Sequence, residues 1–165
     1  MSEKEPKKSC PVRAGAARGK AGRDEFRMRV RDIMTRPVVT VQASMSVRVA
    51  ARKMRDCGIG ILPVVEAGRL VGMVSDRDIT VRMVSESKSA ESVAAAEVMS
   101  PGVLHCFEDQ TIEEVAGLMG DHQVRRMPVL DRSGRLVGIV SMGDIAEDAS
   151  EILAGEALGE VVEDR

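Results

Sequence analysis

The sequence predicts an α+β fold made of two copies of one βαββα-type unit that pack on each other. Three observations lead to this prediction: an internal repeat, apolar positions at helical spacing, and Val-rich runs joined by Gly-containing turns. The run LPVV at residues 62–65 recurs as MPVL 65 positions later. The run RLVGMVS at 69–75 recurs as RLVGIVS 66 positions later. The single inserted residue falls in the turn between the two runs, where an insertion costs little.

Each copy is expected to begin with a short strand, at Val38 to Val41 and at Val103 to Cys106. A helix should follow, because apolar residues then recur at i, i+3, i+4 and i+7. These residues are Val47, Ala50, Ala51 and Met54 in the first copy, and Ile112, Val115, Ala116 and Met119 in the second.

The ends of these elements also carry signals. Thr111 and Glu114 predict a capping box at the start of the second copy's helix, and Gly58 is expected to end the helix of the first. Each copy then continues with a strand hairpin and a second helix, which follows Ser75 or Ser141. The hairpins are expected at about 61–65 with 69–74 and 126–130 with 135–140.

The predicted organisation is a disordered basic tail (1–27), a first repeat (28–85), a linker (86–95), a second repeat (96–150) and an acidic C-terminal tail (151–165). Residues 1–31 hold ten Lys/Arg and four Asp/Glu, a charge of +6, so with a net charge of −2 the remainder carries −8. A basic arm of this kind binds a polyanion or the body of its own protein, or is a solvated flexible tail.

Composition narrows the class of protein. With two Phe, no Tyr and no Trp, the core must be aliphatic and no aromatic platform is available for stacking bases, so nucleic-acid recognition is not expected. Three cysteines without a CxxC pair suit a reducing cytosol. No apolar run approaches the ~20 residues of a membrane helix, and the N-terminus lacks the apolar stretch of a secretory signal. We expect a cytoplasmic protein that does not enter a membrane.

Four runs carry a resemblance to a known family: DIMTRPVVTV, GIGILPVVEAGRLVGMVSDRDI, EVMS and HQVRRMPVLDRSGRLVGIVSMGDI. Over residues 29–149 the sequence resembles tandem CBS-domain pairs (Bateman modules), and is similar to stand-alone bacterial members of the hypoxic-response type. The resemblance implies a pseudo-twofold pair of repeats, association as a homodimer, and a regulatory role. It also implies binding of AMP, ADP, ATP or a related adenosyl ligand in clefts between the repeats.

The motif G-h-h-S-x-x-D, in which h is apolar, occurs at residues 72–78 and 138–144, where a strand is expected to turn into a helix. A helix N-terminus suits phosphate, and a Ser hydroxyl caps the helix or donates to a phosphate oxygen. A carboxylate accepts hydrogen bonds from ribose hydroxyls. The resemblance assigns ribose to Asp78 and Asp144. The simpler interpretation makes Ser75 and Ser141 N-caps and both Asp residues first-turn acids.

Arg125 and Arg126 supply planar guanidinium donors that match phosphate. The resemblance places them in the cleft that contains Asp78, whereas the cleft with Asp144 faces the uncharged Gly60 and Ile61. The alternative is two solvated surface arginines. By resemblance, adenine is read by backbone amides at two sets of positions, which are Thr35, Val39, Ile59 and Gly60, and then Ser100, Leu104, Val124 and Arg125.

Metal and catalytic sites find little support in the sequence. His105, Cys106, Cys57 and His122 are of metal-ligand type, but close paired spacing is absent, and no metal or cofactor other than an adenine nucleotide is expected. With two His and no nucleophile or Walker motif, an enzyme is not expected. The sequence therefore favours a nucleotide-sensing regulatory module that acts on an unidentified partner protein. The alternatives are an interaction or structural protein with vestigial clefts, and a nucleic-acid or membrane-surface binder acting through residues 1–31.

Overall fold

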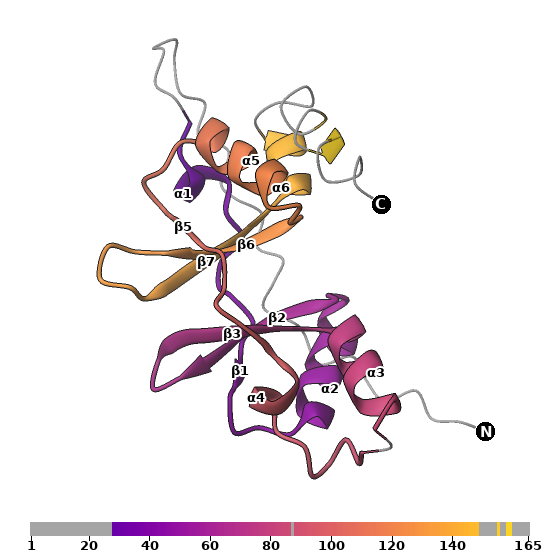
Figure 1. The fold of residues 1–165 in the computed structure, drawn as a ribbon. Helices are drawn as coiled ribbons and strands as arrows, with labels where there is room; N and C mark the ends of the chain where they lie inside the picture. Colours follow the sequence, from indigo (N-terminus) through magenta and orange to yellow (C-terminus); the bar gives the residue numbers. More distant parts are fainter. Residues whose placement is uncertain (1–27, 87, 149–154, 156–157, 160–165) are drawn as a thin grey trace, which may run out of the picture. The chain divides into compact units, whose positions relative to one another are not determined.

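The computed structural model describes residues 28–86, 88–148, 155, 158 and 159 (Figure 1). Within this part of the chain there are two compact units. Among the described residues one unit contains Val39–Val103, and the other joins residues 28–38 to residues 104–148. The tail predicted at 1–27 and nearly all of the acidic tail at 151–165 lie outside the described residues.

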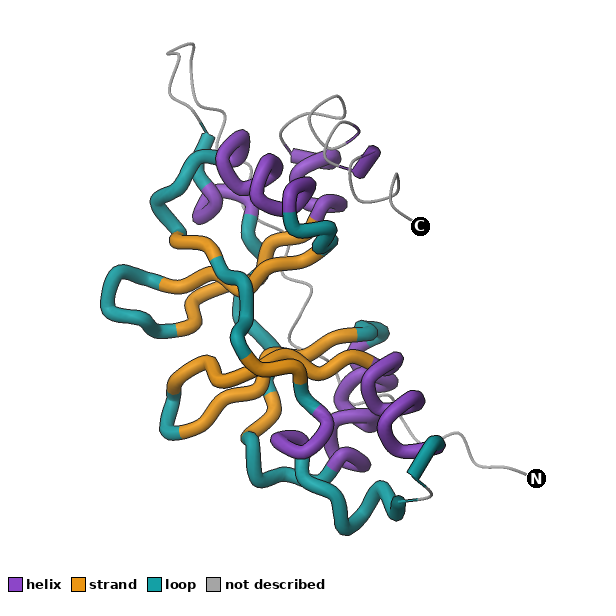
Figure 2. Tube along the Cα trace, viewed as in Figure 1, coloured by secondary structure: helices purple, strands orange, loops and turns teal. Residues whose placement is uncertain are grey.

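In the first unit, the strands form a sheet of order β1-β2-β3-β4. β1 (Val41–Gln42) runs parallel to β2 (Ile61–Glu66), and β2 forms an antiparallel hairpin with β3 (Arg69–Ser75). β4 (Ser100–Pro101) pairs with the other edge of β3. The helices α2 (Val47–Cys57), α3 (Asp76–Val84) and α4 (Ala95–Val98) lie on one side of this sheet (Figures 1 and 2).

The second unit repeats this plan with a sheet of order β5-β6-β7. β5 (Cys106–Phe107) is parallel to β6 (Arg126–Leu130), and β6 is antiparallel to β7 (Leu136–Ser141). Its helices are α1 (Val30–Ile33), α5 (Ile112–Asp121) and α6 (Met142–Asp148). The mixed helix and strand content and the repeated hairpins confirm the predicted α+β tandem repeat.

Helix ends follow the sequence signals. Thr111 Oγ1 accepts a hydrogen bond from the Glu114 amide at 3.3 Å, and Glu114 Oε2 accepts one from the Thr111 amide at 3.1 Å, which is the predicted capping box. Gly58 ends α2 with a φ of 65°, a left-handed conformation that suits glycine. The first strand of each copy is displaced from its prediction, because β1 and β5 begin only at Val41 and Cys106. The preceding Val-rich residues make no ladder of their own.

The leading segment of each repeat lies in the compact unit of the other repeat. Thr35 is near the start of the first repeat, yet its amide donates to the Ile139 carbonyl of β7 at 2.9 Å, and the Ile139 amide donates back at 3.2 Å. Ser100 is near the start of the second repeat and pairs with Met73 of β3. Both pairings occupy an outer edge of a hairpin, whose backbone groups need partners. The compact units therefore divide the chain at points other than the repeats expected at 28–85 and 96–150.

A methionine from each leading segment packs over a glycine of the hairpin. A Cβ atom at Gly138 would lie 2.9 Å from Cγ and 3.2 Å from Cβ of Met34. At Gly72 it would lie 2.9 Å from Cγ of Met99 and 3.1 Å from the Ser100 carbonyl oxygen. The first glycine of each G-h-h-S-x-x-D motif is thus required for close packing of the leading segment.

Each unit has its own aliphatic core, as the composition predicted. Fully buried residues of the first unit include Val41, Val47 and Leu62, and those of the second include Met119 and Ile145. The linker expected at 86–95 contributes to the first core, since Val93 is 5% exposed and its carbonyl accepts a hydrogen bond from the Val47 amide at 2.9 Å. This linker is therefore packed along the start of α2.

The turn of the first hairpin contains a strained alanine. Ala67 has a φ of 47° and is followed by Gly68 with a φ of 77°, the pair of positive angles found in type I′ turns, which favour Asn-Gly. We expect Ala67→Asn to raise the free energy of unfolding by about 0.5–1 kcal/mol, because Asn tolerates the left-handed region and Ala does not. Urea denaturation measures this change. Ala67→Val is the control and should destabilise the fold; equal stability of the three proteins would contradict the assignment.

The inserted residue gives the second hairpin a different turn. Asp131 Oδ1 accepts hydrogen bonds from the Ser133 hydroxyl at 2.6 Å and from the Ser133 and Arg135 amides at 2.9 and 3.0 Å. These hydrogen bonds, the one from the Ser133 hydroxyl foremost, hold the pKa of the Asp131 carboxyl well below its usual range. The inserted residue therefore produces a turn that is stabilised by hydrogen bonds to the single carboxylate of Asp131.

Candidate functional site

The first G-h-h-S-x-x-D motif lies where β3 ends and α3 begins. Asp78 Oδ2 accepts hydrogen bonds from the Ser75 amide at 2.9 Å and from the Ser75 hydroxyl at 2.6 Å, and Ser75 Oγ accepts one from the Asp78 amide at 3.0 Å. Ser75 is thus the N-cap of α3, and the two residues form a capping box. The simpler interpretation of the motif describes this geometry correctly.

The second motif repeats the arrangement at the start of α6. Asp144 Oδ2 accepts from the Ser141 amide and hydroxyl, both at 2.7 Å, and Ser141 Oγ accepts from the Asp144 amide at 3.2 Å. In each motif the single hydroxyl proton is directed at the Asp carboxylate. In this arrangement each Ser hydroxyl donates to the Asp carboxylate of its own motif, and each carboxylate keeps Oδ1 for another donor.

The two Asp carboxylates differ in their second oxygen. Asp78 Oδ1 lies 3.3 Å from Nη2 of Arg82, with the Asp78 side chain 22% exposed. The position equivalent to Arg82 in the second repeat is Asp148, and within the described residues Asp144 has no ion pair. Sequence reasoning missed Arg82, although an acid and a base four residues apart on a helix are a recognisable signal.

The residues expected to contact adenine fall into the two units. Val39 and Ile59 are half-buried against the core of the first unit, and Leu104 and Val124 occupy the same places in the second. Thr35 and Ser100 are the edge residues paired with Ile139 and Met73. All six residues therefore take part in core packing or in backbone pairing within their own unit, as expected of residues that serve the fold.

Arg125 and Arg126 lie beside the N-terminus of α6 and are exposed. The Arg125 carbonyl accepts a hydrogen bond from the Met142 amide at 3.1 Å, and Arg126 is paired with Ser141 across β6 and β7. In the first unit the Gly60 carbonyl accepts from the Asp76 amide at 2.9 Å, and Ile61 is paired with Ser75. The two residues at the start of the strand next to the capping box are therefore both cations in the second unit (Arg125, Arg126) and both uncharged in the first (Gly60, Ile61).

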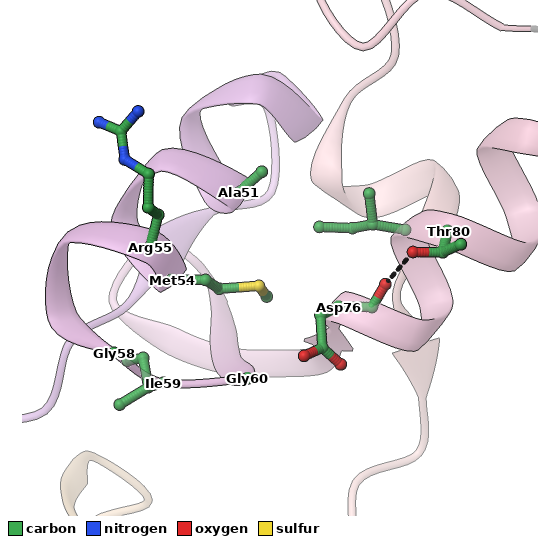
Figure 3. Close-up of a pocket in the computed structure, with 9 residues that line it drawn as sticks. Ala51, Met54, Arg55, Gly58, Ile59, Gly60, Asp76 and Thr80 are labelled. Atoms are coloured by element: carbon green, nitrogen blue, oxygen red, sulfur yellow. Dashed lines mark hydrogen bonds between the residues drawn. The ribbon is translucent and has the colours of Figure 1, made fainter.

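A cavity of about 490 Å³ opens between α2 and α3 (Figure 3). Met54 points into it, the Arg55 guanidinium points away, and the Asp76 carboxylate lies beside Gly60. Its lining residues are Ala51, Met54, Arg55, Gly58, Ile59, Gly60, Asp76, Ile79 and Thr80. Of the predicted site residues, only Ile59 and Gly60 are among them.

This cavity is separate from the carboxylate of Asp78. On α3 the lining residues Asp76, Ile79 and Thr80 share one helical face, because they are spaced by three and four residues. Asp78 and Arg82 are four apart and lie on another face of the same helix. The Asp78 carboxylate is therefore not among the groups that line the cavity between α2 and α3.

Metal binding gains no support from the described residues, in which no group of three or more His, Cys, Asp or Glu could hold an ion. Cys106 is fully buried, and burial raises the pKa of its thiol to about 12, so the thiolate that a metal requires is disfavoured. Nor does any helix within the described ranges have the length and apolar character needed to cross a membrane.

Comparison with known proteins identifies the family. The model of the CBS domain matches residues 30–85 and 95–151. The chain belongs to the CBS-domain family. Relatives of this CBS pair include the CBS domain-containing protein YhcV of Bacillus subtilis, which is 38% identical over 130 residues, 78% of this chain and 91% of YhcV. Hypoxic response protein 1 of Mycobacterium tuberculosis is 36% identical over 122 residues, 73% of this chain and 85% of the relative.

Solved structures of CBS pairs agree with the fold. Hypoxic Response Protein I with two coordinated zinc ions has a TM-score of 0.68 at 35% identity, over 73% of this chain and 98% of that one. CBSX2 in complex with AMP has a TM-score of 0.65 at 28% identity, over 76% and 98%. The CBS pair of MJ0100 in complex with 5′-methylthioadenosine and S-adenosyl-L-methionine has a TM-score of 0.64 at 30% identity, over 78% and 98%.

Proposed function

We propose that this CBS pair is a non-catalytic regulatory module that senses an adenine nucleotide of the AMP, ADP or ATP type. The observation that carries the proposal is the pair of Ser–Asp motifs at equivalent helix N-termini. Each presents a carboxylate with one oxygen fixed by its own serine. A carboxylate held in one orientation is a prepared acceptor for the two hydroxyls of a ribose. CBS pairs of the same fold hold AMP and S-adenosyl-L-methionine.

In the two proposed sites, Asp78 and Asp144 each accept hydrogen bonds from the ribose hydroxyls of one nucleotide. The half-buried aliphatic residues near β1 and β5 face the adenine, which is read through backbone amides. A ligand signals when it binds one arrangement of the module better than another, since only differential affinity shifts a conformational equilibrium. The partner that reads this shift, and the association of two chains as a homodimer, remain predictions of the resemblance.

An interaction or structural protein without ligand is the second candidate. It is favoured by the capping boxes, because Ser75, Asp78, Ser141 and Asp144 satisfy one another without a nucleotide. The nucleic-acid or membrane-surface hypothesis depends on residues 1–31, most of which lie outside the described residues.

A thermal-shift series tests the proposal. AMP, ADP, ATP, NAD and S-adenosylmethionine are each added to the full chain, and a ligand that binds only the native state stabilises it by about 2.7 kcal/mol at a hundredfold excess over Kd. We expect at least one adenine nucleotide to raise Tm by several degrees. The double variant Asp78→Asn/Asp144→Asn should lose this increase.

The comparison uses the ligand-induced change in Tm, not Tm itself. The variants should stay folded, because the side-chain oxygen of Asn at N3 can still accept the hydrogen bond from the Ser75 or Ser141 amide. A folded, unmutated chain whose Tm does not respond to any of the five compounds at millimolar concentration would favour the protein without ligand.

A further inference from the structure

The guanidinium of Arg82 is held by the polypeptide at the end of α4. It donates to the carbonyls of Val98 and Met99, the latter at 2.8 Å, and to the Ser100 hydroxyl at 3.1 Å. Carbonyls at the end of a helix lack partners within that helix, and an Arg side chain can supply them. The planar fork of Arg suits several acceptors held at fixed positions. The segment 98–100 therefore determines where this guanidinium lies.

The same guanidinium reaches the carboxylate of Asp78, one turn earlier on α3. Nη2 of Arg82 lies 3.3 Å from Asp78 Oδ1, and the two side chains are 40% and 22% exposed. An ion pair with this exposure contributes little to the free energy of unfolding, so its effect is on geometry. Asp78 Oδ2 is already held by the Ser75 amide and hydroxyl. Both carboxylate oxygens are thus restrained, and Oδ1 can still accept a hydrogen bond from a ligand, because it has two lone pairs.

The segment that holds Arg82 is itself fixed to the sheet of the first unit, since Ser100 pairs with Met73 of β3. Arg82 therefore connects a segment anchored on the sheet to a carboxylate at the start of α3. Both ends of this connection belong to one proposed nucleotide site. The resemblance assigns Asp78 to the ribose and Arg125 to the same cleft, and Ser100 belongs to the set of adenine-reading positions that includes Arg125.

We propose that Arg82 is a positioning residue of this nucleotide site, which fixes the ribose acceptor Asp78 relative to the backbone at Ser100 that faces the adenine. The inference rests on the proposed function and concerns the Asp78 site alone. A nucleoside contacts both positions at once, so a site in which they are already correctly spaced loses less conformational freedom on binding. Freeing the Asp78 side chain and the segment that carries Ser100 should therefore weaken binding.

Calorimetry with AMP on the full-length chain tests this role. The Asp78 site is the binding event that Asp78→Ala abolishes and Asp144→Ala retains. We expect Arg82→Gln to weaken this event by about three- to tenfold, the cost of ordering one side chain on binding, and to leave the event at Asp144 unchanged. Arg82→Lys keeps the positive charge but lacks the fork that reaches several acceptors at once, so it should weaken the event nearly as much.

Two further measurements separate positioning from charge and from general stability. Arg77→Gln removes the same charge from an exposed position of α3, and it should bind AMP as the unmutated chain does. Hydrogen exchange of the peptide covering 97–103, measured by mass spectrometry without ligand, should be severalfold faster in Arg82→Gln and Arg82→Lys than in the unmutated chain. Arg77→Gln should leave this exchange unchanged.

Full AMP affinity in Arg82→Lys would show that only the charge matters, and equal weakening of both binding events would show a general loss of structure. Either result, or unchanged exchange in 97–103, would overturn the positioning role of Arg82 and leave the proposed function intact. A titration without any AMP binding event that depends on Asp78 would also overturn this role. The absence of all AMP binding to the unmutated chain would in addition reject the proposed function for this nucleotide.

Discussion

Replacing Gly138 by alanine is expected to lower the free energy of unfolding by about 1–3 kcal/mol, the usual cost of overpacking a core. The added methyl group would overlap Met34, which lies across β7 and is 5% exposed. Because Met34 comes from the leading segment of the first repeat, the clash disturbs the contact that holds this segment in the second unit. Chemical denaturation of the two proteins measures the difference.

Gly117 provides the matched control. It lies on the exposed side of α5, and a Cβ atom there would meet no atom within 4 Å, so Gly117→Ala should stabilise the helix by up to about 1 kcal/mol. A double-mutant cycle isolates the contact: in a Met34→Ala background, Gly138→Ala should cost much less than in the unmutated chain. An equal cost in both backgrounds would show that Met34 is not what excludes a side chain at Gly138.

The two proposed nucleotide sites are expected to differ in affinity by about ten- to a hundredfold, because a hydrogen bond to a charged group contributes about 1.5–3 kcal/mol. Arg125 and Arg126 are the cations that create the difference, and the prediction assigns them to the nucleotide held by Asp78. Calorimetry of Asp78→Ala and of the double variant Arg125→Ala/Arg126→Ala should therefore show loss of the same high-affinity event. Asp144→Ala should retain that event.

The pairing between β6 and β7 supports an alternative assignment of the two arginines. Arg126 is paired with Ser141, which caps α6 together with Asp144. If both arginines serve the ribose on Asp144 instead, Asp144→Ala and the arginine variant will lose the tight event together, and Asp78→Ala will spare it. That result would reverse the assignment without removing the nucleotide from the proposal.

Local structure was predictable because its signals are local. The hairpins, the start of α5 at Thr111 and the end of α2 at Gly58 all follow from side chains within a few residues of the element. The exchange of leading segments was not predictable in this way. Sequence similarity groups Thr35 with the first repeat, whereas the open edge of β7 determines its actual partner.

The candidate site was predictable in the same way, in its local features only. The repeated Ser–Asp spacing indicated a helix N-terminus and two carboxylates, and both are present. Arg82 was missed because its significance comes from Val98, Met99 and Ser100, which only the fold brings beside it. The role of Gly72 and Gly138 was missed for the same reason, since the methionine that covers each glycine belongs to the other repeat.

Equilibrium binding of AMP to the full-length chain tests the central claim most directly. We predict saturable binding of one or two AMP molecules per chain, reduced at least tenfold in affinity by Asp78→Asn/Asp144→Asn, while Arg77→Gln binds as the unmutated protein does. Binding that is undiminished in the double Asp variant would contradict the assignment of ribose to these carboxylates. The absence of saturable binding of AMP, ADP and ATP to the folded, unmutated chain at millimolar concentration would contradict nucleotide sensing itself.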